Sequence, residues 1–166
     1  MAKDRFLLII LAVIAGLAVL AVGLFFLRRG QLDYGPEDTP QGVVRNYVVA
    51  LGKKDFQRAY DYLREGQGKP DFDRFRQDFL ARQLDISGTA VQIGETQASG
   101  ADVIVSLLVI HSGGGPFGDV FRESSSAVVT KDAAGAWKIA SMPYPYWGWD
   151  WYNPQSLKPA PAVPGD

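Results

Sequence analysis

The centre of the chain reads DVIVSLLVIH at residues 102–111. Successive side chains of a strand point to opposite faces, and in this run both alternating sets are apolar. One set is Val103, Val105, Leu107 and Val109, and the other is Ile104, Leu108 and Ile110. A run of this kind is typical of a central strand that is covered on both faces. We therefore expect a sheet to organise this part of the chain.

Alternating patterns on either side predict three further strands, over residues 89–96, from about 119 to 130, and over 136–142. Turns at 98–100 and 132–135 and a Gly-rich connection at 112–118 separate the four strands. Strands joined by such short connections pair antiparallel, because a parallel pair needs a long crossover. The pattern therefore predicts an antiparallel sheet of about four strands.

Before the sheet, apolar residues recur at three- and four-residue steps, which is the period of a helix. Thr39 and Asp71 are the expected N-caps of a first and a third helix, and Asp55 begins the second. Pro40 suits the first helical position, and Gly52 is expected to end the first helix. The apolar stripes are Val43, Val44, Tyr47, Val48 and Leu51; Phe56, Ala59, Tyr60 and Leu63; and Phe72, Phe75, Phe79 and Leu80. Three helices packed over one face of the sheet predict an α+β domain at residues 39–142.

The order of these elements resembles that of the nuclear transport factor 2-like superfamily. Three short motifs carry the resemblance. They are Thr39-Pro40 before Val43-Val44-Arg45-Asn46-Tyr47, then Lys54-Asp55-Phe56 with Ala59-Tyr60-Asp61-Tyr62-Leu63, and Gly135-Ala136-Trp137-Lys138-Ile139. The resemblance implies a cone-shaped fold, similar to that of membrane-anchored bacterial members of unknown function. Because the motifs are structural, they imply no particular activity.

Enzymes of this superfamily, such as ketosteroid isomerases, scytalone dehydratase and polyketide cyclases, place acid and base residues on the sheet face that lines the cone. The resemblance makes His111 a candidate for a hydratase- or isomerase-like reaction, with Glu123 or Asp119 on the next strand as its partner. Further candidates for lining the pocket are Tyr47, Tyr60 and Trp137. An exposed histidine at a strand end and a purely structural aromatic core explain the same residues without catalysis.

The N-terminal segment 6–27 holds twenty-two consecutive residues without a charge, an amide or a hydroxyl. As a helix it would extend about 33 Å, enough to cross a hydrocarbon core of about 30 Å. We predict a single-pass membrane anchor at residues 1–29, followed by a linker at 30–38. A cleavable signal peptide is the alternative, although Ala21-Val22-Gly23 is a weak cleavage site and the apolar run continues beyond it. The absence of cysteine excludes a lipoprotein anchor.

Charges at the two ends of the anchor are balanced, with Lys3 and Arg5 before it and Arg28 and Arg29 after it. Because the N-terminus is short, we expect the domain on the extracytoplasmic side of the cell membrane. Ala12, Gly16 and Gly23 lie roughly on one face of the helix, which predicts a contact with another membrane-protein subunit. Glycine and alanine are also common in membrane helices in general.

The composition excludes several classes of site. Seventeen Lys and Arg against eighteen Asp and Glu give a net charge of −1, so nucleic acid is not an expected partner. One histidine and no cysteine argue against zinc, and the Gly-rich stretch lacks the Gly-Lys-Ser/Thr of a phosphate-binding loop. We expect no metal and no cofactor.

The C-terminal tail at residues 143–166 is aromatic and then Pro-rich. Six of the nine residues in 144–152, YPYWGWDWY, are aromatic. In an extended backbone, Trp147, Trp149 and Trp151 would project to one side. Such a row suits docking on a partner subunit, the membrane interface or the stacking of sugar rings. Alternatively, the segment folds back over the open cone of its own domain.

Together these features favour a non-enzymatic accessory or scaffolding subunit of a membrane protein complex. The alternatives are a binding module that holds an apolar small molecule in the cone cavity, and an enzyme that uses His111. A cone filled by its own side chains favours the scaffold. A deep cavity lined by polar groups favours the alternatives.

Overall fold

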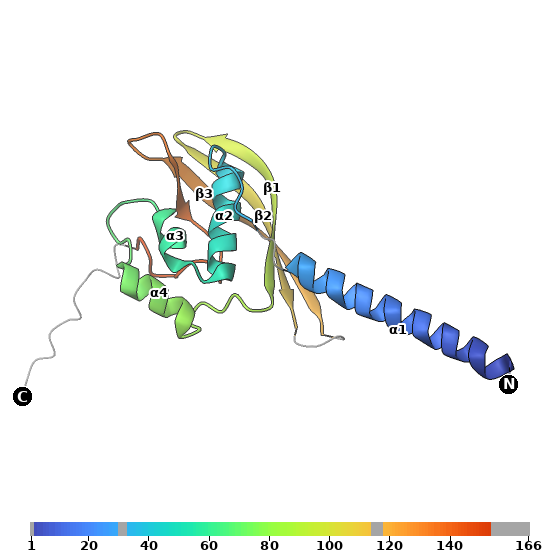
Figure 1. The fold of residues 1–166 in the computed structure, drawn as a ribbon. Helices are drawn as coiled ribbons and strands as arrows, with labels where there is room; N and C mark the ends of the chain where they lie inside the picture. Colours follow the sequence, from blue (N-terminus) through green and yellow to red (C-terminus); the bar gives the residue numbers. More distant parts are fainter. Residues whose placement is uncertain (1, 30–32, 114–117, 154–166) are drawn as a thin grey trace, which may run out of the picture. The chain divides into compact units, whose positions relative to one another are not determined.

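The computed structural model of the chain describes residues 2–29, 33–113 and 118–153, and within the first range the side chains of residues 9–23. The chain forms two compact units, Met1–Asp33 and Tyr34–Asp166. Figure 1 shows the helices and strands of both units.

The first unit contains one helix, α1 (Ala2–Arg29), which confirms the helical conformation expected for the apolar segment. Its large described side chains, from Ile9 to Val22, are exposed and fall on every side of the helix. Gly16 and Gly23, two of the three predicted contact residues, have open space where a Cβ atom would lie. Across the described residues, no helix is both long enough and apolar enough to span a membrane. The anchor at residues 1–29 stays a prediction.

The second unit begins with three helices: α2 (Pro40–Lys53), α3 (Phe56–Asp61) and α4 (Phe72–Leu80). The three predicted N-caps are confirmed, because Thr39, Asp55 and Asp71 each accept a hydrogen bond from the backbone N–H three residues further on. Gly52 does not end α2. The helix continues to Lys53, and Lys54 ends it in the left-handed conformation, donating its N–H to the carbonyls of Ala50 and Leu51.

The four strands form one antiparallel sheet in the order β1-β2-β3-β4. The strands are β1 (Thr89–Ser99), β2 (Asp102–Ser112), β3 (Val120–Lys131) and β4 (Trp137–Ser141). Each strand pairs with the next in the sequence, and the register between β1 and β2 shifts between Ile93 and Thr96. The predicted α+β class and the antiparallel pairing are confirmed.

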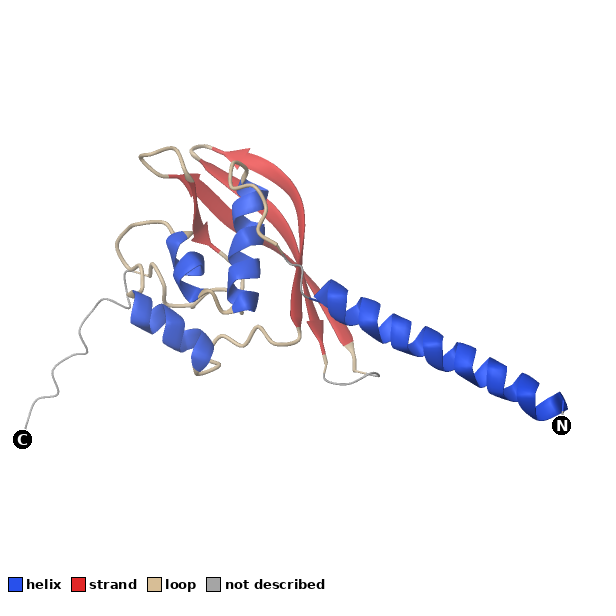
Figure 2. Cartoon of the chain, viewed as in Figure 1, coloured by secondary structure: helices blue, strands red, loops and turns tan. Residues whose placement is uncertain are grey.

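The helices of the second unit lie on one face of this sheet (Figure 2). Val105, Leu107 and Val109 on β2 are buried against them. The alternate residues Ile104, Leu108 and Ile110 are only half-buried. The expectation that β2 is covered on both faces is therefore wrong for the described residues. An antiparallel sheet built from hairpins can leave one face open, whereas parallel sheets are covered on both.

The core of the second unit includes residues on both sides of the predicted segment 39–142. Tyr34 packs against it at one end, and Tyr146, Trp147 and Trp151 are buried in it at the other. The Trp151 ring lies 5.3 Å from that of Phe75 and 5.2 Å from that of Trp147, between ring centroids. The aromatic segment is thus part of the packed interior rather than an appendage.

Candidate functional site

The aromatic segment at 144–152 follows a series of turns instead of an extended path. The N–H of Tyr146 donates to the carbonyl of Pro143, and the N–H of Trp151 to that of Gly148. A Cβ atom on Gly148 would collide with the Trp151 indole, so this turn requires glycine. Because the backbone turns, the side chains of the segment do not alternate as they would in a strand.

The three predicted partner-binding tryptophans consequently separate. Trp147 and Trp151 are 8% and 5% exposed, whereas Trp149 is 87% exposed. The Trp151 indole N–H donates to Asp78 Oδ2 at 3.1 Å, and the Trp147 ring stacks on that of Tyr152. A row of three indoles on one side is therefore not formed. Trp147 and Trp151 are unavailable to a partner while the core stays packed, and Trp149 is available.

A groove of about 260 Å³ lies beside Trp149. We call it the Trp149 groove; its lining is Arg74, Asp78, Gln83, Leu84, Tyr144, Gly148, Trp149 and Asp150. Tyr144 is 65% exposed, so two aromatic side chains flank the groove. Arg74 pairs with Asp150 across it. A large exposed indole next to polar groups is the composition of a protein-binding surface.

The predicted residues form no acid–base pair between the helices and the sheet. Tyr47 is fully buried and donates its hydroxyl to the carbonyl of Tyr146 at 2.7 Å. Burial raises the pKa of Tyr47 well above its ordinary value. Tyr60 donates to the carbonyl of Pro70 at 2.9 Å and packs edge-on against Phe75. Both hydroxyls are thus used to hold neighbouring backbone.

His111 lies near the end of β2, opposite Thr89 on β1 and Phe121 on β3. Its ring contacts that of Phe121, with 6.0 Å between centroids. Glu123 is exposed and stands opposite Val109, two residues along the strand from His111. Within the described ranges, no hydrogen bond joins His111 to a carboxylate. The structure therefore does not assemble the His111–Glu123 pair.

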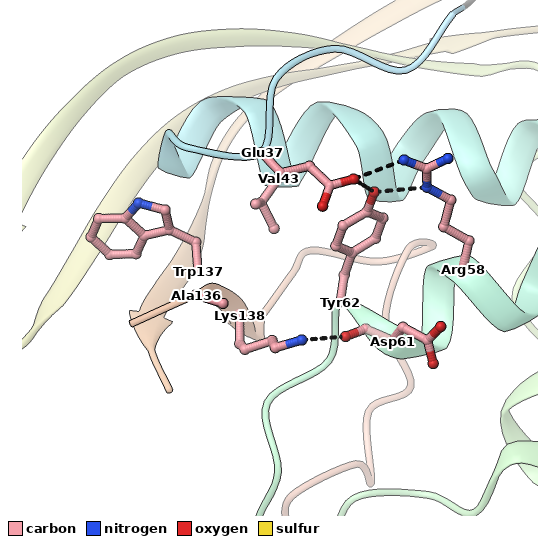
Figure 3. A pocket seen from close by; sticks show the side chains of 8 residues that line it. All are labelled: Glu37, Val43, Arg58, Asp61, Tyr62, Ala136, Trp137 and Lys138. Carbon is pink, nitrogen blue, oxygen red and sulfur yellow. Dashed lines mark hydrogen bonds and ion pairs between the residues drawn. The ribbon is translucent and has the colours of Figure 1, made fainter. Parts of the chain in front are cut away.

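A polar pocket of about 270 Å³ lies beside the start of the domain (Figure 3). We call it the Glu37 pocket; its lining is Glu37, Val43, Arg58, Asp61, Tyr62, Ala136, Trp137 and Lys138. Of the predicted pocket residues, Trp137 is the one that lines it. The Trp137 indole donates to the carbonyl of Asp38 at 3.1 Å.

Glu37 is the centre of this pocket. Its Oε1 accepts from the Tyr62 hydroxyl at 2.6 Å and from Arg58 Nη2 at 2.8 Å, and Arg58 Nε donates to the same hydroxyl at 3.0 Å (Figure 3). The hydrogen bond from Tyr62 is the main cause that lowers the pKa of Glu37, and the hydrogen bond from Arg58 adds to it. Burial raises the pKa of Tyr62. The Glu37 carboxylate is therefore stabilised in its charged form, and the Tyr62 hydroxyl keeps its proton and donates a hydrogen bond to Glu37.

The same region fixes residues 34–38, which the sequence assigned to a linker. Asn46 is fully buried, and its side-chain amide accepts from the N–H of Gly35 and donates to the carbonyl of Gly35, both at 2.8 Å. Tyr34 donates to Asp55, and the Arg58 guanidinium lies 3.5 Å from the centroid of the Tyr34 ring. Sequence reasoning missed this clamp. The available signal was Asn46 beside the apolar stripe of α2, since a buried amide needs partners.

The polar groups described so far are satisfied by one another. Among the described residues, no buried side-chain nitrogen or oxygen lacks a partner, and no three His, Cys, Asp or Glu are grouped as metal ligands. The Glu37 pocket therefore joins chain segments, whereas the Trp149 groove presents an indole that is 87% exposed.

Neither a protein-family model nor a curated protein matches the sequence. Among solved structures, a proposed ketosteroid isomerase from Shewanella frigidimarina aligns with 20% identity and a TM-score of 0.47, over 62% of this chain and 92% of its own. A proposed nuclear transport factor 2-like transpeptidase from Campylobacter jejuni has 18% identity and a TM-score of 0.44, over 63% and 99%. A SEC-C motif protein from Rhodopseudomonas palustris has 15% identity and a TM-score of 0.45, over 69% and 82%. With TM-scores below 0.5, these likenesses carry no argument about this chain.

Proposed function

We propose that this chain is a non-enzymatic, single-pass membrane protein that acts as an accessory or scaffolding subunit of a membrane protein assembly. One observation carries the proposal: the core between the helices and the sheet is packed with the chain's own side chains, among them Tyr146, Trp147 and Trp151 of the aromatic segment. A domain whose interior is packed with its own side chains binds partners through its outer surface.

The membrane tether rests on the apolar segment at 6–27 and its helical conformation in α1. A helix that is apolar on every side buries that surface in a protein core or in a bilayer. The second unit builds its own core from residues 34 onward. We place this domain on the extracytoplasmic side, and we assign it to the nuclear transport factor 2-like superfamily from its three helices followed by a four-stranded antiparallel sheet.

Two surfaces are proposed for partner subunits. The first is the Trp149 groove, because tryptophan and tyrosine often dominate the binding energy of protein interfaces. The second is the helix face with Ala12, Gly16 and Gly23, where small side chains allow a second helix to approach closely.

The test is purification of the full-length chain from its native membrane in mild detergent, followed by mass spectrometry of the proteins that travel with it. We expect a stoichiometric set of membrane proteins, and we expect Trp149→Ala to reduce their recovery by about tenfold, since truncating an interface hot spot costs 2 kcal/mol or more. Phe121→Ala is the matched control, because Phe121 is also an exposed aromatic residue, at 62%. Recovery of this chain alone would contradict the scaffolding role.

A further inference from the structure

A third pocket has a volume of about 390 Å³ and borders the buried core. It is formed where α2 and α4 end, with the start of α3 and the loop before β1 completing it. We call it the α2–α4 pocket. Its apolar lining is Leu51, Phe56, Phe79, Leu80, Leu84 and Ile86. The volume lies within the range of ligand-binding sites, roughly 300–1,000 Å³.

The apolar lining of this pocket includes both buried and exposed side chains. Leu51, Phe79 and Leu84 belong to the buried core, so they hold their positions without a ligand. Leu80 lines the same pocket and is 48% exposed. Because exposed apolar surface in a concave site favours an apolar occupant, the lining suits a hydrocarbon chain.

Two cationic residues line the pocket together with these apolar side chains. Lys54 has a φ of 60° and Arg82 a φ of 58°, so both stand in the left-handed conformation that follows many helix ends. Glycine takes this conformation without cost, whereas other residues are strained in it. A long basic side chain thus occupies each of two positions where glycine would fit with less strain.

The hydrogen bond from the Ser87 hydroxyl is the main cause that lowers the pKa of Asp85, which lines the same pocket, and the charge of Arg82 contributes to the lowering. In the described part of the chain, Arg82 thus acts on that carboxylate without a close ion pair. No ion pair or hydrogen bond there engages the side chain of Lys54 or Arg82. The acidic residue of the lining, Asp85, is already occupied, because its Oδ1 accepts from the N–H of Ser87 at 2.9 Å and from the Ser87 hydroxyl at 2.5 Å. The pocket therefore offers an apolar wall and an excess of positive charge at the same place.

We propose that the α2–α4 pocket binds a small amphiphile that carries one carboxylate on an unbranched apolar chain. The chain lies against the apolar lining, and the carboxylate pairs with Lys54 and Arg82. Charge-assisted hydrogen bonds to a carboxylate are stronger than neutral ones, so the two cations select for the anion. Because Trp149 does not line this pocket, the outcome is independent of the docking proposed for the Trp149 groove.

The probe is octanoate, titrated by calorimetry into the full-length chain in phosphatidylcholine nanodiscs, with empty nanodiscs subtracted. Octan-1-ol has the chain without the charge, and acetate has the charge without the chain. We expect saturable binding of octanoate and at least about tenfold weaker binding of each of the other two, because a charged hydrogen bond or two buried methylenes each contribute about 1.5 kcal/mol.

Lys54→Gly and Arg82→Gly should each weaken octanoate binding by about tenfold. Neither should lower the melting temperature, because glycine accepts a positive φ. Lys54→Gln and Arg82→Gln remove the charge but keep a long side chain, and they should weaken octanoate binding in the same way. Lys54→Arg keeps the charge and should keep the affinity for octanoate. Arg122→Gln is the matched control, since Arg122 is an exposed cation outside the pocket.

The proposal is overturned if octanoate shows no saturable binding, or if octan-1-ol or acetate binds as tightly as octanoate. It is also overturned if the glycine and glutamine variants bind octanoate with the affinity of the unmodified chain.

Discussion

Asn46 shows how one residue ties two segments of the chain together. It is fully buried on α2, and its amide satisfies both backbone groups of Gly35, which precedes the first predicted element of the domain. The pattern of apolar residues predicts where α2 lies. It does not predict which group pairs with Asn46, a polar side chain next to the apolar stripe of this helix. The partner is set by the path of residues 34–38, and that path depends on contacts with α3 and β4 as well.

Asn46→Ala should destabilise the domain by about 1–3 kcal/mol, because it leaves two partly buried backbone groups of Gly35 without their side-chain partner. Urea unfolding of the full-length chain in detergent, followed by tryptophan fluorescence, measures this loss. Gln97→Ala is the control, because Gln97 is exposed on β1 and should change stability by less than about 0.5 kcal/mol. Equal stability of the two variants would contradict the role of Asn46.

Glu37 gives the domain a pH dependence. Its folded-state pKa lies below the ordinary value of 4.5, mainly because Tyr62 donates a hydrogen bond to it. The carboxylate therefore stabilises the folded state above pH 4.5, and this contribution is lost as the pH falls through the folded-state pKa. The pair with Arg58 is half-exposed, so solvent screens it and the contribution is at most about 1 kcal/mol.

Glu37→Gln should consequently be less stable than the unmodified chain at pH 7 and should approach it in stability as the pH is lowered below 4.5. Urea titrations of both proteins at pH 7 and pH 3.5 measure the two free energies of unfolding. The difference between the proteins at each pH cancels the effect of the carboxylates that they share. Glu95→Gln removes an exposed carboxylate on β1 and serves as the control. A stability difference that stays constant with pH would contradict the assignment.

At the scale of elements, the aromatic segment at 144–152 behaves as a part of the core. Two of its tryptophans pack among Phe75, Phe79 and each other, while the third faces solvent. The alternation that would align all three requires an extended strand, and the turn at Gly148 replaces that strand. Of the alternatives open from the sequence, folding back describes Trp147 and Trp151, whereas Trp149 is exposed and its docking on a partner stays a proposal.

Trp151→Ala should therefore cost about 3–5 kcal/mol of unfolding free energy, because it removes a buried ring and leaves a cavity. Trp149→Ala should change it by less than about 0.5 kcal/mol, because that side chain is 87% exposed. Thermal melting of the two variants side by side makes the comparison. Similar losses in both would show that the segment is not packed in this way.

At the scale of the whole molecule, the chain consists of a helical unit and a domain, and the core of the described domain is packed with its own side chains. Its free features lie on the surface: the Trp149 groove and the α2–α4 pocket, each on the helical side of the sheet. A scaffolding domain and an amphiphile site are compatible, because the two surfaces share only Leu84 among their lining residues.

Helices, strands, caps and their order could be read from the sequence because each depends on residues within a few positions of one another. Thr39, Asp55 and Asp71 act on the N–H groups three residues further on, and the apolar period of 102–111 repeats every two residues. Other features depend on residues that are far apart in the sequence. Asn46 binds Gly35, and Trp151 packs on Phe75. The register of β2 and β3 places Glu123 opposite Val109 and not opposite His111. Those features were decided by how the helices and the sheet pack, because only packing determines which distant side chains share the space between them.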